Sequence, residues 1–174
     1  MTSGLGKAIR VVGLWLPLFF LAMALHESLH ALAVMLLGSH PVLVLRPWQL
    51  ALAPVSITGV HVQPVPALDP TRQALDNLAG PGVAAILLGV LALNLPKGAL
   101  RLAVIANAFG LCFYAIIETL DVLLDGRLEV GFLTAPEFNY GVPLLIALAV
   151  AAIGVGRGRP RSSAQDQSFE ASAV

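Results

Sequence analysis

Cysteine and charge are both scarce in this sequence. The chain has 174 residues, of which 11% are charged, and its ten basic and ten acidic residues leave no net charge. Cys112 is the single cysteine, which excludes an internal disulfide and a cysteine-rich zinc site. The sequence has no basic patch, so we expect no nucleic-acid partner.

Histidine is also scarce, whereas apolar residues dominate. The histidines are His26, His30, His40 and His61, too few for an oxygenase that binds its iron through several histidine boxes. Hydrophobic residues make up 57% of the chain, and the mean hydropathy is +0.85. A soluble domain does not reach these values, so the composition predicts an integral membrane protein in contact with the lipid bilayer.

Four apolar runs indicate membrane-spanning helices. They are residues 11–37, 83–95, 102–120 and 140–156. We expect residues 1–156 to form one membrane-embedded domain and the polar, serine-rich residues 157–174 to form a disordered tail. A cleaved signal peptide explains the first run less well, because the apolar residues continue beyond the cleavage-like Ala22-Met23-Ala24.

The segment between the first two runs has a different pattern. Prolines and glycines interrupt residues 38–66, and residues 42–45 and 55–63 have the composition and alternation of short strands. We expect a small β-hairpin at the membrane surface or dipping into the membrane. The predicted fold is therefore mainly α, a polytopic membrane helix bundle of about four spans with this hairpin between spans one and two.

The basic residues predict an orientation. In a four-span arrangement three clusters fall on one side: Lys7 and Arg10, Lys97 and Arg101, and Arg157, Arg159 and Arg161. Basic residues are enriched in cytoplasmic segments, so we expect a cytoplasmic amino terminus and a multi-pass protein of the plasma membrane.

The first apolar run contains the sequence His26-Glu27-Ser28-Leu29-His30. On a helix, residues four apart share a face, so His26 and His30 can bind one metal ion. Glu27 lies beside that face and can serve as a general base. Solvated H-E-x-x-H patterns arise by chance in soluble helices, but ionisable residues inside an apolar run are costly and are more often functional.

A zinc hydrolase site needs a third protein ligand. If the first and third runs start at equal depth, His26 lies level with residue 117 and His30 lies level with residue 121. Glu118 and Asp121 are then at the right level, with Asp121 favoured, whereas Glu118 is as well explained as a polar residue at the end of its span. Asp125 is one turn further along, and we expect His61 to be a surface-strand residue rather than a ligand.

Residues 20–127 resemble the site-2 protease class of intramembrane zinc metalloproteases. The resemblance rests on His26 to Leu32, on Leu78-Ala79-Gly80-Pro81, and on Leu124-Asp125-Gly126. It implies that Asp125 is the third zinc ligand and that the hairpin holds an extended substrate by strand addition. The family's proline-rich approach to this aspartate is absent here, so Asp121 and Asp125 both remain candidates.

Together these features predict a zinc-dependent intramembrane endopeptidase that hydrolyses membrane-embedded peptides or proteins. Its metal ligands would be His26, His30 and either Asp121 or Asp125, and its general base would be Glu27. The backbone at Gly80 and Pro81 would shape the substrate cleft. The alternative is a non-proteolytic membrane protein, either a degenerate relative that acts as a scaffold or a small transporter subunit with a cation site.

Overall fold

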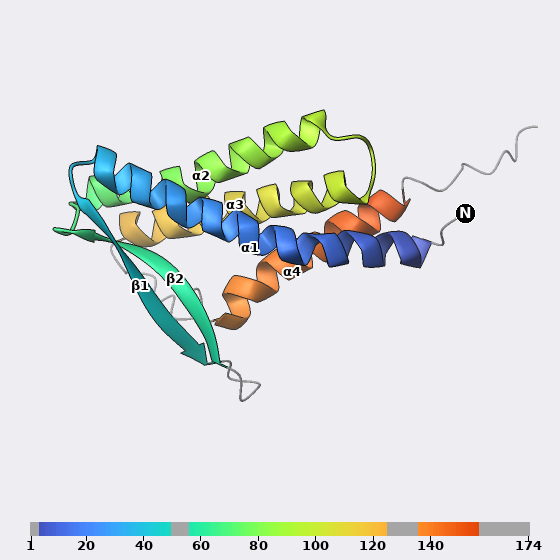
Figure 1. The fold of residues 1–174 in the computed structure, drawn as a ribbon, viewed down its shortest axis with the longest axis horizontal. Coiled ribbons are helices and arrows are strands. Elements are labelled where there is room, and N and C mark those ends of the chain that lie inside the picture. Colours follow the sequence, from blue (N-terminus) through green and yellow to red (C-terminus); the bar gives the residue numbers. More distant parts are fainter. Residues whose placement is uncertain (1–3, 50–55, 125–135, 157–174) are drawn as a thin grey trace, which may run out of the picture.

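The computed structural model describes residues 4–49, 56–124 and 136–156, and these residues form a mainly helical bundle with one hairpin (Figure 1). The elements in chain order are α1 (Gly4–Leu36), β1 (His40–Gln49), β2 (Ser56–Val65), α2 (Pro70–Asn94), α3 (Ala99–Leu123) and α4 (Pro136–Gly156). The predicted fold class is confirmed, including the position of the hairpin between the first two long helices. The predicted tail, residues 157–174, lies outside the described residues.

The helices are longer than the apolar runs that predicted them. α2 begins at Pro70, thirteen residues before its apolar run, because Asp69 caps it: the Asp69 side chain accepts a hydrogen bond from the backbone N–H of Arg72 at 3.0 Å. α1 ends at Leu36, and Gly38 follows with φ +84°, a backbone conformation that glycine adopts readily just after a helix. The turns of α2 that precede the apolar run, residues 70–82, begin with a polar segment.

Small side chains fill the contacts between helices. α1 packs against α2 and α3, α2 packs against α3, and α4 packs against α1 and α3. Four alanines at these contacts are fully buried: Ala84, Ala103, Ala106 and Ala147. A small side chain lets helix backbones approach closely, which is how helices in membranes gain packing energy without a hydrophobic driving force.

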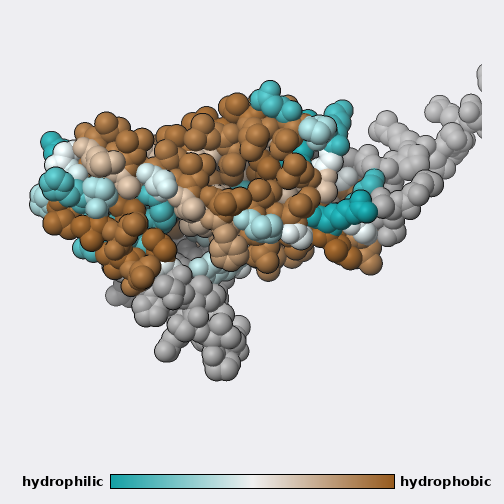
Figure 2. Space-filling view, viewed as in Figure 1, coloured by the Kyte–Doolittle hydropathy of each residue, from teal (hydrophilic) through white to brown (hydrophobic). Residues whose placement is uncertain are grey.

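The outer surface of the bundle is apolar. Of the described helices, α1, α2 and α3 are long and apolar enough to cross a membrane, while the apolar part of α4, Tyr140–Gly156, is shorter. Figure 2 shows hydrophobic residues over the middle of the bundle and hydrophilic ones gathered toward its ends. This distribution indicates a membrane protein, and the fourth span stays a prediction.

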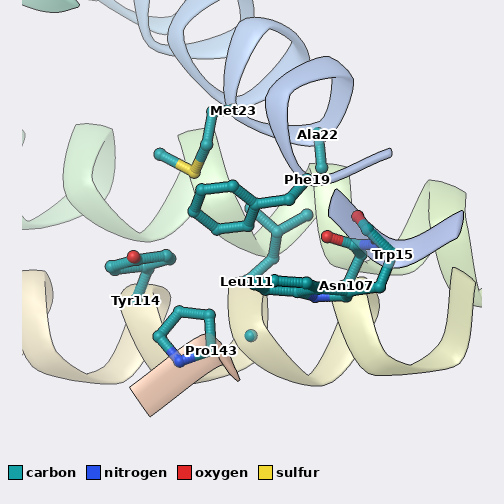
Figure 3. Close-up of a pocket in the computed structure, with 9 residues that line it drawn as sticks. Trp15, Phe19, Ala22, Met23, Asn107, Leu111, Tyr114 and Pro143 are labelled. Atoms are coloured by element: carbon teal, nitrogen blue, oxygen red, sulfur yellow. The ribbon is translucent and has the colours of Figure 1, made fainter. Parts of the chain in front are cut away.

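An interhelical contact fixes the relative depth of α1 and α3. The buried Asn107 of α3 donates hydrogen bonds from Nδ2 to the carbonyl of Ala103 at 3.0 Å and to the carbonyl of Trp15, on α1, at 3.4 Å. Around it the two helices meet α4 through the labelled side chains in Figure 3, among them Phe19, Leu111 and Pro143. Figure 1 shows α1 and α3 running in the same direction, as the four-span arrangement predicts, and the two helices pack against each other.

The buried face of α4 gives a test of this packing. Ala147 is fully buried and Ala149, on the same helix, is exposed. We expect Ala147→Leu to lower the free energy of unfolding by about 1–3 kcal/mol, because the added atoms have no space between the helices, and Ala149→Leu to leave it nearly unchanged. Thermal unfolding of both variants in the same detergent measures this. Equal effects would contradict the packing of α4 described here.

Candidate metal centre

His26 and His30 meet on the buried face of α1. Their side chains lie on successive turns, and their Nε2 atoms are 2.8 Å apart. His26 is 2% exposed and His30 is 7% exposed, so both imidazoles are nearly removed from solvent. The ring of Tyr114, on α3, stacks on His26 with the ring centroids 6.1 Å apart. The predicted convergence of the two histidines is present.

Glu118 of α3 completes the group. Its Oε2 lies 3.4 Å from His30 Nε2 and 3.7 Å from His26 Nε2, and one ligand atom from each of the three residues falls within 4.8 Å of the others. The depth of the helices explains this position. His26 and Glu118 are separated by the same 92 residues as Trp15 and Asn107, which hydrogen-bond across the same two helices.

The two aspartates proposed as third ligand are placed differently. Asp121 is exposed one turn beyond Glu118 on α3, and it is not part of the three-residue group found in the described residues. Asp125 lies outside the described residues. Both assignments stay predictions, and the described geometry favours Glu118, which the sequence analysis had ranked below Asp121.

The backbone of the hairpin holds Glu27. The N–H of Val62, on β2, donates to Glu27 Oε2 at 3.0 Å. The register explains why this N–H is available. Pro41 and Pro64 lie opposite each other, and because neither has an N–H group, they fit only at a pair of residues that makes no hydrogen bond in the antiparallel ladder. Hydrogen-bonded and non-hydrogen-bonded pairs alternate, so the Leu43–Val62 pair, two residues away, is also non-hydrogen-bonded. The Val62 N–H therefore points away from β1 and is available to Glu27.

α2 contributes residues to the site that were not predicted from the sequence. Asp76 is 2% exposed, and its Oδ1 lies 3.0 Å from His30 Nδ1. Asn77 donates from Nδ2 to the backbone carbonyl of Glu118 at 2.8 Å. Four residues follow the i, i+3, i+4, i+7 spacing of a single helix face: Gln73, Asp76, Asn77 and Gly80. This spacing indicates a polar helix face in the sequence, provided that the helix is taken to begin at Pro70.

Gly80 lies against His30 rather than in the cleft wall. A Cβ built on Gly80 would fall 2.5 Å from both His30 Cδ2 and His30 Nε2, so glycine is needed for the imidazole to fit. Pro81 is buried in the bundle. Neither residue is among those that line the cleft in the described structure, and their assignment to substrate binding stays a prediction.

A cleft with a volume of about 910 Å³ opens onto the three-residue group. Its polar side includes the group itself, Glu27, Asp76 and the exposed His61 of β2. Its apolar side comes from α1, α3, α4 and both strands, with Phe19, Phe20, Leu43, Val60, Ile117 and Tyr140. The cleft therefore lies between the hairpin and the helices and reaches both histidines.

The donor set suits a divalent transition metal. Two imidazole nitrogens and one carboxylate are a ligand set found in catalytic zinc sites, which keep a further position open for water or substrate. His30 Nδ1 faces a carboxylate, so its Nε2 is the atom left to bind a metal. The residues present therefore fit zinc, and Glu27 is adjacent in sequence but outside the ligand group.

Comparison of the chain with protein-family models, with curated proteins and with solved structures finds no match.

Gly80 provides a test of the site geometry. We expect Gly80→Ala to destabilise the protein by about 1–3 kcal/mol, because its Cβ would overlap the His30 ring, which Asp76 holds in place. Gly89 is the matched control on α2, since a Cβ there meets nothing within 4 Å. Gly89→Ala should stabilise the helix by up to about 1 kcal/mol. Changes of the same sign in thermal unfolding would contradict the close contact at Gly80.

Proposed function

We propose that the chain is a zinc-dependent intramembrane endopeptidase that hydrolyses peptide bonds of membrane-embedded substrates. The observation that carries this proposal is the convergence of His26, His30 and Glu118, with Glu27 beside them, at the base of a cleft between apolar helices and a hairpin. Ionisable residues are expensive in such surroundings and are functional by default. The resemblance of residues 20–127 to site-2 proteases points the same way.

Three residues would hold the metal: His26 and His30 through Nε2, and Glu118 through a carboxylate oxygen. Zinc in this site would supply a Lewis acid that activates water at neutral pH and polarises the carbonyl of the scissile bond. The buried histidines and the surrounding apolar side chains limit the water around the reacting groups, which strengthens electrostatic interactions there.

Glu27 would transfer the proton. As general base it takes a proton from the attacking water while the water oxygen bonds to the carbonyl carbon. It then gives this proton to the amide nitrogen as the carbon–nitrogen bond breaks, so that the direct products are an amine and a carboxylic acid, which keeps the second proton of the water until it ionises. The hydrogen bond from the Val62 N–H to Oε2 fixes the direction of the Glu27 side chain for both steps.

The structure is compatible with the orientation that the basic residues predict. The start of α1 lies against the end of α4, since Gly4 is next to Val155, and the end of α4 also meets α3 near its start, where Gly154 approaches Leu102. The short α2–α3 connection, which carries Lys97, lies at this same end of the bundle in Figure 1. We propose that this end faces the cytoplasm, with the protein in the plasma membrane.

Replacement of Glu27 tests the reaction. Gln has the same length and can still accept the Val62 N–H, but it cannot take up a proton. We therefore expect Glu27→Gln to lower cleavage of a membrane-embedded peptide in proteoliposomes by at least about 100-fold, the lower range for general base catalysis, while bound zinc stays the same.

Asp69→Asn is the control, because Asp69 is an exposed helix cap that does not line the cleft, and Asn caps a helix equally well. It should retain cleavage. Zinc lost in proportion to activity in Glu27→Gln would show that Glu27 is a structural residue. Zinc bound by a wild-type protein that cleaves no membrane peptide would favour the scaffold or the cation transporter instead.

The third ligand is tested by a pair of variants one turn apart. We expect Glu118→Gln to reduce zinc occupancy strongly, because it removes an anionic oxygen next to both Nε2 atoms, and Asp121→Asn to reduce it little. Zinc content at equal folded yield is the measurement, with Asp125→Asn analysed in parallel. If Asp121→Asn or Asp125→Asn loses more zinc than Glu118→Gln, that aspartate is the third ligand instead, as helix depth predicts for Asp121 and the resemblance implies for Asp125.

A further inference from the structure

α2 supplies none of the three ligand atoms, yet it contacts both helices that do. Asp76 is almost completely buried, and its Oδ1 lies 3.0 Å from Nδ1 of His30. A carboxylate can only accept a hydrogen bond, so Nδ1 of His30 is the protonated nitrogen of the ring. In the neutral ring, the form that binds a metal, the lone pair is then on Nε2, the atom that faces His26 and Glu118.

The other histidine has no such partner. In the part of the chain that is described, His26 Nδ1 is buried without a hydrogen bond, and the ring is held by its stacking on Tyr114. The two imidazoles are therefore supported differently. At Nδ1, His26 is supported by packing alone, whereas His30 donates a hydrogen bond to a carboxylate on a third helix.

A small network on α2 fixes the position of Asp76. Gln73 donates from Nε2 to Asp76 Oδ2 at 3.4 Å and to Asn77 Oδ1 at 2.8 Å. With its oxygen occupied in this way, the Asn77 amide directs Nδ2 at the backbone carbonyl of Glu118, 2.8 Å away. Gln73 thus aligns both Asp76, which contacts His30, and Asn77, which binds the backbone of Glu118 on α3.

We propose that Asp76 is the positioning residue of the metal centre, and that Gln73 and Asn77 support it. Asp76 fixes the tautomer and the ring direction of His30 so that Nε2 is presented to the metal before the metal binds. The proposal rests on the proposed function, because it takes zinc as the ion bound. It adds a carboxylate from a helix that carries no ligand and that the H-E-x-x-H motif does not include.

A purely structural buried ion pair predicts a different result. Such a pair would change the stability of the fold, but the metal environment of the folded protein would stay the same. A positioning residue also changes the affinity for the metal and the geometry of its ligands. Zinc affinity and the ligand-field absorption of the cobalt-substituted protein distinguish the two roles without any measurement of activity.

The experiment compares Asp76→Asn with Asp69→Asn in detergent-solubilised full-length protein. Both variants remove one negative charge near the start of α2, but Asp69 is the exposed residue that caps the helix, where Asn serves equally well. We expect Asp76→Asn to bind zinc about 10- to 100-fold more weakly in competition with a chelator, and its cobalt absorption bands to shift at full occupancy. Asp69→Asn should match the wild type in both measurements.

Two results would overturn the proposal, and they have different consequences. If Asp76→Asn matches the wild type in zinc affinity and cobalt spectrum, Asp76 is not a positioning residue, and the proposed function is unaffected. If the wild type itself binds no zinc, the metal centre fails and the proposed function fails with it. Should Asp76→Asn not fold, Gln73→Leu at the partly exposed Gln73 takes its place, with a several-fold loss of zinc affinity expected and an unchanged affinity contradicting the proposal.

Discussion

The whole arrangement depends on burying ionisable side chains inside a bundle of apolar helices. An unpaired polar group in such surroundings costs several kcal/mol at the upper end of the estimates, and an unpaired charge costs more. Three of these side chains are buried, those of His26, His30 and Asp76, and that of Glu118 is partly exposed. The histidine Nε2 atoms face the Glu118 carboxylate, and His30 Nδ1 faces the Asp76 carboxylate. Each group is tolerated because the others are present, so the site and the packing of three helices form one unit.

Close packing makes these contacts possible. Side chains as short as an aspartate reach a histidine on another helix only if the backbones are near each other, and Gly80 and the fully buried alanines allow that approach. The Asn107 contact with the Trp15 carbonyl sets the depth of α3 against α1, and that depth brings Glu118 level with the two histidines. The residues that set the geometry are therefore distributed along the bundle, well beyond the motif.

Local patterns could be predicted from the sequence, whereas rotation about a helix axis could not. The H-E-x-x-H spacing, the hairpin alternation and the apolar runs depend on near neighbours in the chain, and the fold that they indicate is present. The rise per residue placed both Glu118 and Asp121 within about one turn of the level of the histidines. Choosing Glu118 over Asp121 needs the direction in which each side chain points, which packing decides. Asp76 was missed because its polar surroundings did not look like the start of a buried helix.

The proposed general base and the proposed metal ligands are held by different parts of the protein. His26, His30 and Glu118 are fixed by α1, α2 and α3, while Glu27 takes its direction from the N–H of Val62 on a two-stranded hairpin that stands off the bundle in Figure 1. A two-stranded hairpin has little stability of its own, so its contacts with α1 and with any bound chain determine where β2 lies. A displacement of β2 alters the orientation of Glu27 and leaves the ligand group intact. In the proposed peptidase, an extended substrate that seats the hairpin against α1 would therefore also direct the proton-transfer group toward the bond to be cleaved.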